Sequence, residues 1–255
     1  MTLFRRALLR CLSLAGGPLL AATPLLMPPA ARAIPEAEAV KKLAVIPVFV
    51  LANDQGVPLP IPRDKTLILP LYLERSQANS ELANFQKGNP QIKAQVLALP
   101  LNIATEKIEQ LNKQLKDGRT LVAPVVSRDQ DRKQAIAILK KQGLSDKQVE
   151  EGLSTPVFFT KPLLTLNTPQ GPRGVFFFRY DDMEKALGAL QDSKKLEPQA
   201  ADLTAALREI IKAKDDVFIF FPTPEYFALV KEQQQQQQKQ QPKQGSAVAP
   251  PPAAP

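Results

Sequence analysis

The residue types that carry out most enzyme chemistry are scarce in this chain of 255 residues, which has no His and one Cys. Without imidazole there is no Ser-His-Asp or Cys-His nucleophile and no His-ligated zinc, haem or iron. The acid pairs Asp181-Asp182 and Asp215-Asp216 lie at a predicted helix start and in a turn, where carboxylates cap backbone N–H groups. The sequence therefore predicts a binding protein that is not an enzyme, with no catalytic residues, no metal site and no cofactor.

The N-terminal segment has the pattern of a secretory signal peptide. Arg5, Arg6 and Arg10 precede an apolar run, and Ala31 and Ala33 are small residues at the two positions that a signal peptidase reads. Gly and Pro residues interrupt the run, so a membrane-spanning helix is the weaker alternative. We predict cleavage after Ala33, export to a periplasm or an equivalent compartment, and no stable membrane insertion afterwards.

Removal of residues 1–33 changes the charge and cysteine content of the chain. The segment contains four Arg and no acid, so the net charge falls from +8 to +4. Cys11 is also lost, and a mature chain without cysteine cannot hold a disulfide. The remaining basic residues are not interleaved with aromatic residues in clusters, so no nucleic-acid partner is predicted.

The C-terminal residues 231–255 are rich in Gln, Pro and Ala and contain almost nothing to bury. We predict that they form a disordered tail. Thr223 and Pro224 form a helix cap and first-turn pair ahead of the tail, so extension of a helix into its first residues is the alternative.

An imperfect internal duplication organises the chain between the signal peptide and the tail. A Pro-Val-Phe unit begins at Pro47 and again at Pro156, 109 residues later. Leu69 and Phe177 keep nearly the same offset of 108 residues. We predict two pseudo-repeats, a first half at 34–144 and a second half at 145–230.

Strand and helix signals follow the same order in both halves, since short apolar segments alternate with amphipathic ones. Pro198 weakens the strand expected at 196–199. The predicted fold class is α/β of the mixed α+β kind, with two pseudo-symmetric halves, each a mixed sheet with amphipathic helices packed on it. Other predicted strands cover 46–50, 66–73, 92–99, 120–126, 155–159, 163–166, 175–180 and 217–221; helices cover 105–117, 129–142, 145–151 and 203–214 and begin at Ser76, Asp181 and Pro224.

Proline occurs inside several of the predicted strands. Pro47, Pro70, Pro124 and Pro156 each remove a hydrogen-bond donor from a strand-like segment. We therefore expect these residues at strand ends or sheet edges, where they limit uncontrolled pairing.

Phenylalanine gathers in the second half, where the strands at 175–180 and 217–221 are apolar on both faces. Such a strand is either covered on both faces or leaves one face open for a partner. The open face is the functional alternative, because Phe rings bind apolar segments without directional hydrogen bonds. The candidate client-binding residues are Phe49, Phe158, Phe159, Phe176, Phe177, Phe178, Phe218, Phe220 and Phe221.

The order of these motifs resembles one known family. The Pro-Val-Phe units at 47–49 and 156–158, the strand and helix at 175–187 and the strand and helix at 121–137 are similar to those of its cyanobacterial members. The family is named for the 22-kilodalton component of the chloroplast inner-envelope translocon. Residues 71–75 depart from it, because they are less aromatic than the family's usual first-half strand.

The resemblance implies a pseudo-symmetric pair of mixed α/β halves with apolar grooves, in a non-enzymatic protein of the periplasm or the thylakoid lumen. It also implies a chaperone-like role in protein translocation or outer-membrane biogenesis. The expected partners are unfolded precursors and an Omp85-type barrel-assembly protein. The alternative is an envelope scaffold that binds a folded partner and has no chaperone activity.

Overall fold

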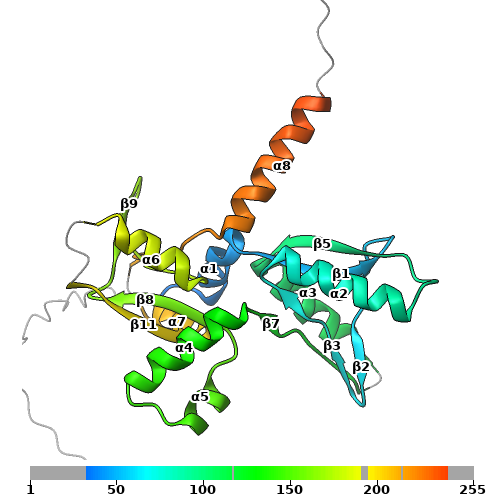
Figure 1. Cartoon of the computed structure of the whole chain (residues 1–255), viewed down its shortest axis with the longest axis horizontal. Coiled ribbons are helices and arrows are strands. Elements are labelled where there is room, and N and C mark those ends of the chain that lie inside the picture. The colour runs from blue at the N-terminus through cyan, green and yellow to red at the C-terminus, as the bar shows by residue number, and fades with distance from the viewer. Residues whose placement is uncertain (1–32, 117, 191–194, 214, 241–255) are drawn as a thin grey trace, which may run out of the picture. The chain divides into compact units, whose positions relative to one another are not determined.

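The structure is a computed structural model that describes residues 33–116, 118–190, 195–213 and 215–240 (Figure 1). The predicted signal peptide, apart from Ala33, and the tail beyond Gln240 lie outside these residues. The described chain combines helices with parallel and antiparallel strands, which confirms the predicted mixed α+β class. No helix within the described ranges is long and apolar enough to cross a membrane.

The first half follows the predicted order of elements. The turn after its first strand forms as expected, because Asn53 Oδ1 accepts hydrogen bonds from the N–H groups of Gln55 and Val57 at 3.0 and 2.9 Å. Gly56 takes a φ of 79° in this turn, a backbone conformation that glycine adopts without steric cost. The elements are α1 (Glu36–Lys41), the 3₁₀ helix η1 (Lys42–Val45), β1 (Pro47–Asn53), β2 (Ile61–Arg63), β3 (Thr66–Ile68), β4 (Leu71–Tyr72), α2 (Arg75–Gly88), β5 (Ala94–Pro100), α3 (Leu101–Gln114), β6 (Thr120–Val122), β7 (Val125–Val126) and α4 (Asp129–Lys141).

The second half begins with the predicted short helix. Ser145 and Gln148 form a complete capping box at its start, in which each side chain bonds the other residue's backbone N–H. The elements are α5 (Asp146–Gly152), β8 (Pro156–Lys161), β9 (Thr165–Thr168), β10 (Gly171–Phe176), α6 (Tyr180–Gly188), β11 (Glu197–Asp202), α7 (Leu203–Lys212), β12 (Phe218–Phe220) and α8 (Pro224–Gln240).

Strand pairing in the first half centres on β1, which lies between β5 and β4 and is antiparallel to both. β4 is parallel to β7, which completes the sheet order β5-β1-β4-β7. Strands β2 and β3 form an antiparallel hairpin, and β3 is parallel to β6.

The same order and sense of pairing occur in the second half. β8 is antiparallel to β11 and makes an antiparallel bridge from Phe158 to Phe177, just beyond β10. β10 is antiparallel to β9 and parallel to β12. Because Phe49 pairs with Tyr72 in the first half, the counterpart of Phe177 is Tyr72 and not Leu69. A symmetry relation between the halves in space stays a prediction.

The prolines lie at the ends of strands or between strands, as expected for residues without a backbone N–H donor. Pro47 and Pro156 begin β1 and β8, while Pro70 and Pro124 separate β3 from β4 and β6 from β7. The two long strands expected at 66–73 and 120–126 are therefore each broken into two short ones. Pro198 does not prevent a strand, because within the described ranges β11 pairs only with β8, which leaves its other edge without a strand partner there.

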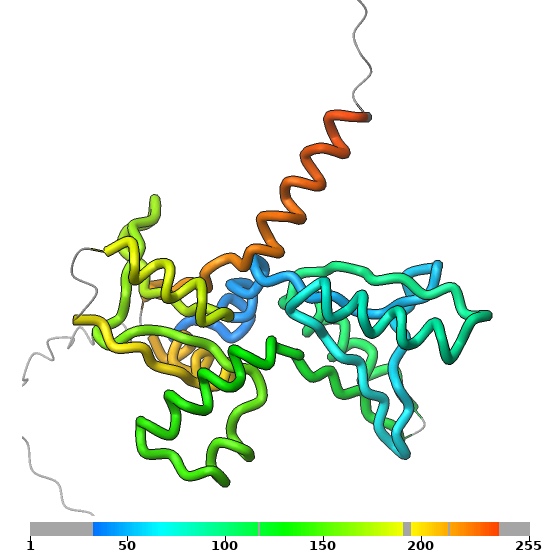
Figure 2. The backbone as a smooth tube through the Cα atoms, in the orientation of Figure 1, coloured from blue at the N-terminus to red at the C-terminus, as the bar shows by residue number. Residues whose placement is uncertain are grey.

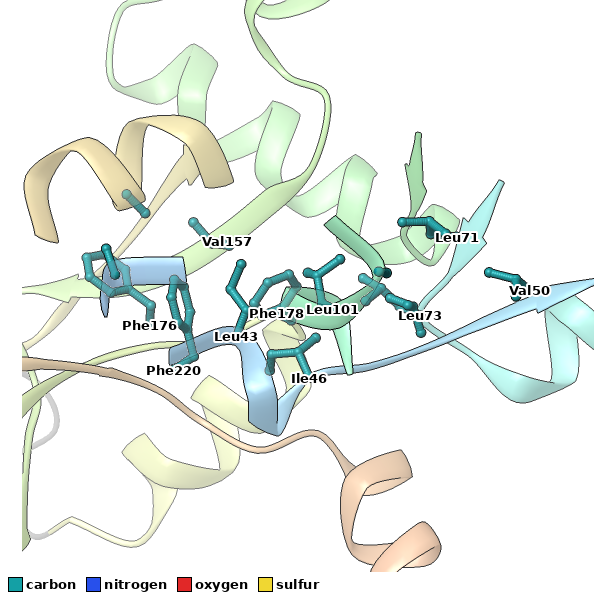
Figure 3. Packing of buried hydrophobic residues seen from close by; sticks show 14 of the residues in the cluster. Leu43, Ile46, Val50, Leu71, Leu73, Leu101, Val157, Phe176, Phe178 and Phe220 are labelled. Atoms are coloured by element: carbon teal, nitrogen blue, oxygen red, sulfur yellow. The ribbon is translucent and has the colours of Figure 1, made fainter. Parts of the chain in front are cut away.

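Two hydrophobic cores hold the described chain together. The larger contains residues from both halves, such as Leu43, Leu101, Phe176, Phe178 and Phe220, whose side chains gather around the start of β1 (Figure 3). The smaller core lies on the other face of the second-half strands and includes Phe158 and Phe177.

Helix α4 connects the two halves of the chain. It belongs to the first half in sequence, yet it packs on β8 and β11 of the second half, as the green stretch in Figure 2 shows. Its buried residues Ala135, Ile138 and Leu139 lie in the smaller core with Ala200 of β11. The predicted boundary at residue 144 divides the pseudo-repeats in sequence and stays a prediction, because a duplication in sequence does not determine which half a connecting helix packs against.

Helix α8 extends into the predicted tail. It continues through the glutamine run to Gln240, so residues 231–240 are helical, which agrees with the alternative of a helix that extends into the first tail residues. Glutamine is a good helix former, and composition without apolar residues does not prevent a helix from continuing beyond a capped first turn. Residues 241–255 lie outside the described chain.

Candidate binding grooves

Most of the predicted client-binding phenylalanines lie inside the protein. Phe49, Phe158, Phe176, Phe177, Phe178 and Phe220 are at most 5% exposed. Phe159, Phe218 and Phe221 are partly buried. Of the two alternatives, cover on both faces therefore fits these residues better than one open Phe-rich face, and their role in binding clients stays a prediction.

Both faces of the central second-half strand are covered. Phe176 and Phe178 point into the larger core, while Val175 and Phe177 point into the smaller one. Helix α7 contributes residues to the core on the first face, and α4, α5 and α6 contribute residues to the core on the second, so both faces of the strand are apolar.

The first-half groove is a cavity of about 390 Å³ between α3 and the strands β1, β4 and β5. Its walls are aliphatic, with Val50 and Leu97 from the strands and Ile108 and Leu111 from the helix. Leu111 is 38% exposed at the groove's edge, so a ligand that covered it would remove apolar surface from water. Lys107 also lines the groove.

The second-half groove is a cavity of about 520 Å³ between α7 and the strands β8, β10, β11 and β12. Its apolar wall is aromatic, formed by Phe159, Phe176 and Phe218. The ring of Phe176 lies 5.6 Å from that of Phe159 and 5.7 Å from that of Phe218 between centroids, which are favourable stacking distances. Two of the three partly buried candidates therefore do line a cavity.

The grooves lie at matching positions of the two halves. Val50 and Phe159 are each the fourth residue of their strand, and Ala104 and Ala206 are each the fourth residue of their helix. All four residues line the respective groove. Volumes of 390 and 520 Å³ are in the range of ligand-binding cavities. Of these four residues only Phe159 was predicted from the sequence, because the grooves need α3 and α7 in place over their sheets.

Gly174 lies against two residues that line the second-half groove. A Cβ at this position would collide with Leu163 Cδ2 and lie 3.2 Å from Phe218 Cδ1. Leu163 and Phe218 both line the groove, so any side chain at residue 174 would push them into it.

A buried polar junction joins the two halves where their helices begin. Glu74 precedes α2, and its Oε1 lies 3.7 Å from Arg179 Nη1 and 3.9 Å from Arg128 Nε. Burial raises the pKa of Glu74, and the two guanidinium groups offset this only in part. The junction fixes the helix starts and leaves the grooves apolar.

The predicted acid pairs have structural roles. Asp181 Oδ2 accepts a hydrogen bond from Arg128 Nη1 at 2.9 Å, and Asp182 is buried beside Arg179. Asp216 forms ion pairs with Lys42 and Arg173. No group of acids, Cys or His within the described residues could hold a metal ion.

Asp202 holds the start of α7 over the second-half groove. Its carboxylate accepts hydrogen bonds from the N–H groups of Ser154, Thr155 and Thr204, each at 2.9 Å. Burial tends to raise the pKa of Asp202, but these bonds outweigh it and hold the pKa below its usual value. This cap ties α7 to the loop before β8.

No protein-family model and no curated protein matches the chain. Solved structures do. Anabaena Tic22, described as a protein of protein transport, is similar over 78% of this chain and 97% of its own, with 20% sequence identity and a TM-score of 0.64. The chain has the Tic22 fold. Tic22 from Plasmodium falciparum is similar over 77% of this chain and 98% of its own, with 17% identity and a TM-score of 0.61.

The Tic22 fold agrees with the resemblance noted in the sequence. The similarity covers nearly the whole length of both solved chains and more than three quarters of the present one. At 17–20% identity it establishes the arrangement of the backbone, while the residues that line the grooves are this chain's own.

Proposed function

We propose that this protein is a Tic22-type protein that binds apolar segments of precursor proteins in transit and is not an enzyme. The two apolar grooves at matching positions carry the proposal. The protein-transport description of Anabaena Tic22, which has the same fold, supports it.

The grooves suit reversible binding of varied chains. Their walls offer aliphatic or aromatic surface, which favours apolar side chains without demanding one hydrogen-bond pattern. Binding of this kind is non-directional, so an unfolded client can be held and later released. In this proposal the protein acts in the periplasm, with the thylakoid lumen as the alternative, after cleavage of the signal peptide.

Unfolded outer-membrane or translocating precursors are the proposed clients, and an Omp85-type barrel-assembly protein is the proposed recipient. The test measures aggregation of a denatured outer-membrane barrel in the presence of residues 34–255, which contain both hydrophobic cores of the described fold. We expect the protein to keep the barrel soluble.

Groove variants sharpen this test. Leu111→Asp and Ala205→Asp each place a charge at the edge of one groove. Each is expected to lower protection several-fold, and the double variant to remove most of it, because covering a leucine side chain contributes roughly 1.5–3 kcal/mol. Leu190→Asp is the matched control, since Leu190 is 40% exposed, as against 38% for Leu111, and lies outside both grooves.

The outcome also distinguishes binding of unfolded clients from the alternative of a scaffold without chaperone activity. A folded double variant that protects as well as the unchanged protein would refute binding in the grooves. Capture of a folded barrel-assembly protein by a chain that never suppresses aggregation would favour the scaffold.

A further inference from the structure

The two grooves differ in the charge at their edges. Lys107 is the one charged residue among the described residues that line the first-half groove, where Gln110 and Gln114 accompany it. The second-half groove is lined by Lys161, Arg208, Glu209 and Lys212.

The cations of the second-half groove are not all neutralised. Lys212 Nζ pairs with Glu209 Oε1 at 2.9 Å. Lys161 and Arg208 form no ion pair with any described residue, and Lys161 forms none even with Glu197, its partner in strand register. Two positive charges therefore stand free beside an apolar cavity.

The free cations lie beside aromatic rings. Lys161 points to the same face of β8 as Phe159, because side chains two residues apart in a strand share a face. Arg208 extends from α7 on the opposite wall. A ligand side chain among the Phe rings would thus have a cation on each side of the groove entrance.

We propose that the second-half groove selects apolar segments in which an aromatic residue adjoins a carboxylate. The inference rests on the proposed function and names the substrate class of one of its two sites. The aromatic ring packs on Phe159, Phe176 and Phe218, and the carboxylate remains at the edge, where Lys161 and Arg208 attract it. The carboxylate belongs to an Asp or Glu side chain or to a chain terminus.

Exposed charges set the expected size of the effect. Ion pairs in contact with water are weak, and each one changes affinity by about two- to fivefold. Added salt screens them, so the preference must shrink between low and high ionic strength. The apolar contribution to binding, by contrast, does not weaken with moderate salt.

The experiment uses fluorescent peptides and residues 34–255. One peptide carries a Phe followed by Glu, and its partner has Gln in place of Glu; both end in an amide. A third peptide omits the residue after the Phe and ends at the Phe with a free C-terminal carboxylate. Fluorescence polarisation measures binding at 25 mM and 300 mM salt. We expect the Glu peptide to bind about three- to tenfold more tightly than the Gln peptide at low salt, and the third peptide to show whether a terminal carboxylate serves equally.

Charge variants test which residues cause the preference for the Glu peptide over the Gln peptide. Lys161→Gln combined with Arg208→Gln is expected to reduce the ratio of the two affinities to about one, and Glu209→Gln to increase it. Lys133→Gln combined with Lys185→Gln is the control, because it lowers the net charge equally on α4 and α6, outside the groove, and should leave the ratio unchanged.

The possible failures are distinguishable. Equal binding of the Glu and Gln peptides, or a preference that survives the Lys161 and Arg208 changes, would overturn the selectivity and leave the proposed function standing. Absence of binding by every peptide would overturn both.

Discussion

Helices α4 and α8 hold the same place in the order of the two halves but pack in opposite ways. Each follows the last strand of its half, β7 or β12. The third, seventh, tenth and eleventh residues of α4 are buried, and they are Asp131, Ala135, Ile138 and Leu139. The same positions of α8 are Tyr226, Val230, Gln233 and Gln234, and the two glutamines are exposed.

The two helices nevertheless make the same kind of contact, each with the first residue of another helix. Asp131 Oδ1 accepts a hydrogen bond from the N–H of Tyr180, the first residue of α6, at 2.9 Å. Glu225 Oε1 accepts one from the N–H of Arg75, the first residue of α2, at 3.2 Å. Each helix therefore caps a helix of the other half. A polar contact therefore holds the first turn of both helices in place. Whether the rest of each helix is buried depends on whether apolar residues follow two and three turns later.

The largest effect is expected from the two capping acids. Asp131 is buried and accepts two hydrogen bonds from Arg128, at 2.6 and 2.8 Å, besides the cap. Asp131→Ala should lower the free energy of unfolding by about 3–5 kcal/mol, because it leaves a largely buried guanidinium without its main partner. Glu225→Ala removes a single longer bond and should cost about 1 kcal/mol or less. Urea denaturation measures both, and equal losses would contradict the comparison.

The next effect concerns the apolar residues of each helix. Ile138→Ala removes a side chain that is 8% exposed in the smaller core and should cost about 2–4 kcal/mol. Val230 is partly buried, so Val230→Ala should cost about 1 kcal/mol or less. Thermal unfolding monitored by circular dichroism compares the two variants. A larger loss for Val230 would show that α8 packs as firmly as α4.

Much of the fold could be predicted from local patterns. The capping box at Ser145, the helix over α4 and the strand ends at proline all follow from the chemistry of a few neighbouring residues. Pairing between distant strands was harder to predict from the sequence. Strand register shows that Tyr72 is the counterpart of Phe177, whereas the spacing of residues in the sequence had suggested Leu69.

The candidate site could be predicted only in part. The concentration of Phe in the second half indicated an aromatic site, but periodicity gives no information on which helix covers which face of a strand. Phe177 is buried in the smaller core with residues of α4 and α6, whereas Phe218 is partly buried and lines the groove beside α7. Lys161 and Arg208 were missed because they lie far apart in sequence and meet only at the groove.

The smallest effect is expected beyond the capped turn of α8. Glu232 makes two hydrogen bonds to Arg75, at 2.7 and 3.0 Å, and Arg75 also lies over the ring of Phe49 at 5.3 Å. The hydrogen bond to Arg75 is the main reason that the pKa of Glu232 lies below its usual value. A lowered pKa means that this contact stabilises the folded chain at neutral pH and is lost as the pH falls through that lowered value.

Glu232→Gln should leave global stability unchanged within error, because the Glu232 side chain is 46% exposed and such pairs contribute little. Amide hydrogen exchange of residues 233–240 should nevertheless become faster, since the ion pair is the contact that anchors this part of the helix to α2. Glu209→Gln, which breaks the exposed pair with Lys212 inside α7, is the control and should not change exchange in α8. Unchanged exchange at 233–240 in Glu232→Gln would mean that the glutamine helix persists through its own backbone propensity, and α8 would then differ from α4 even more than its burial indicates.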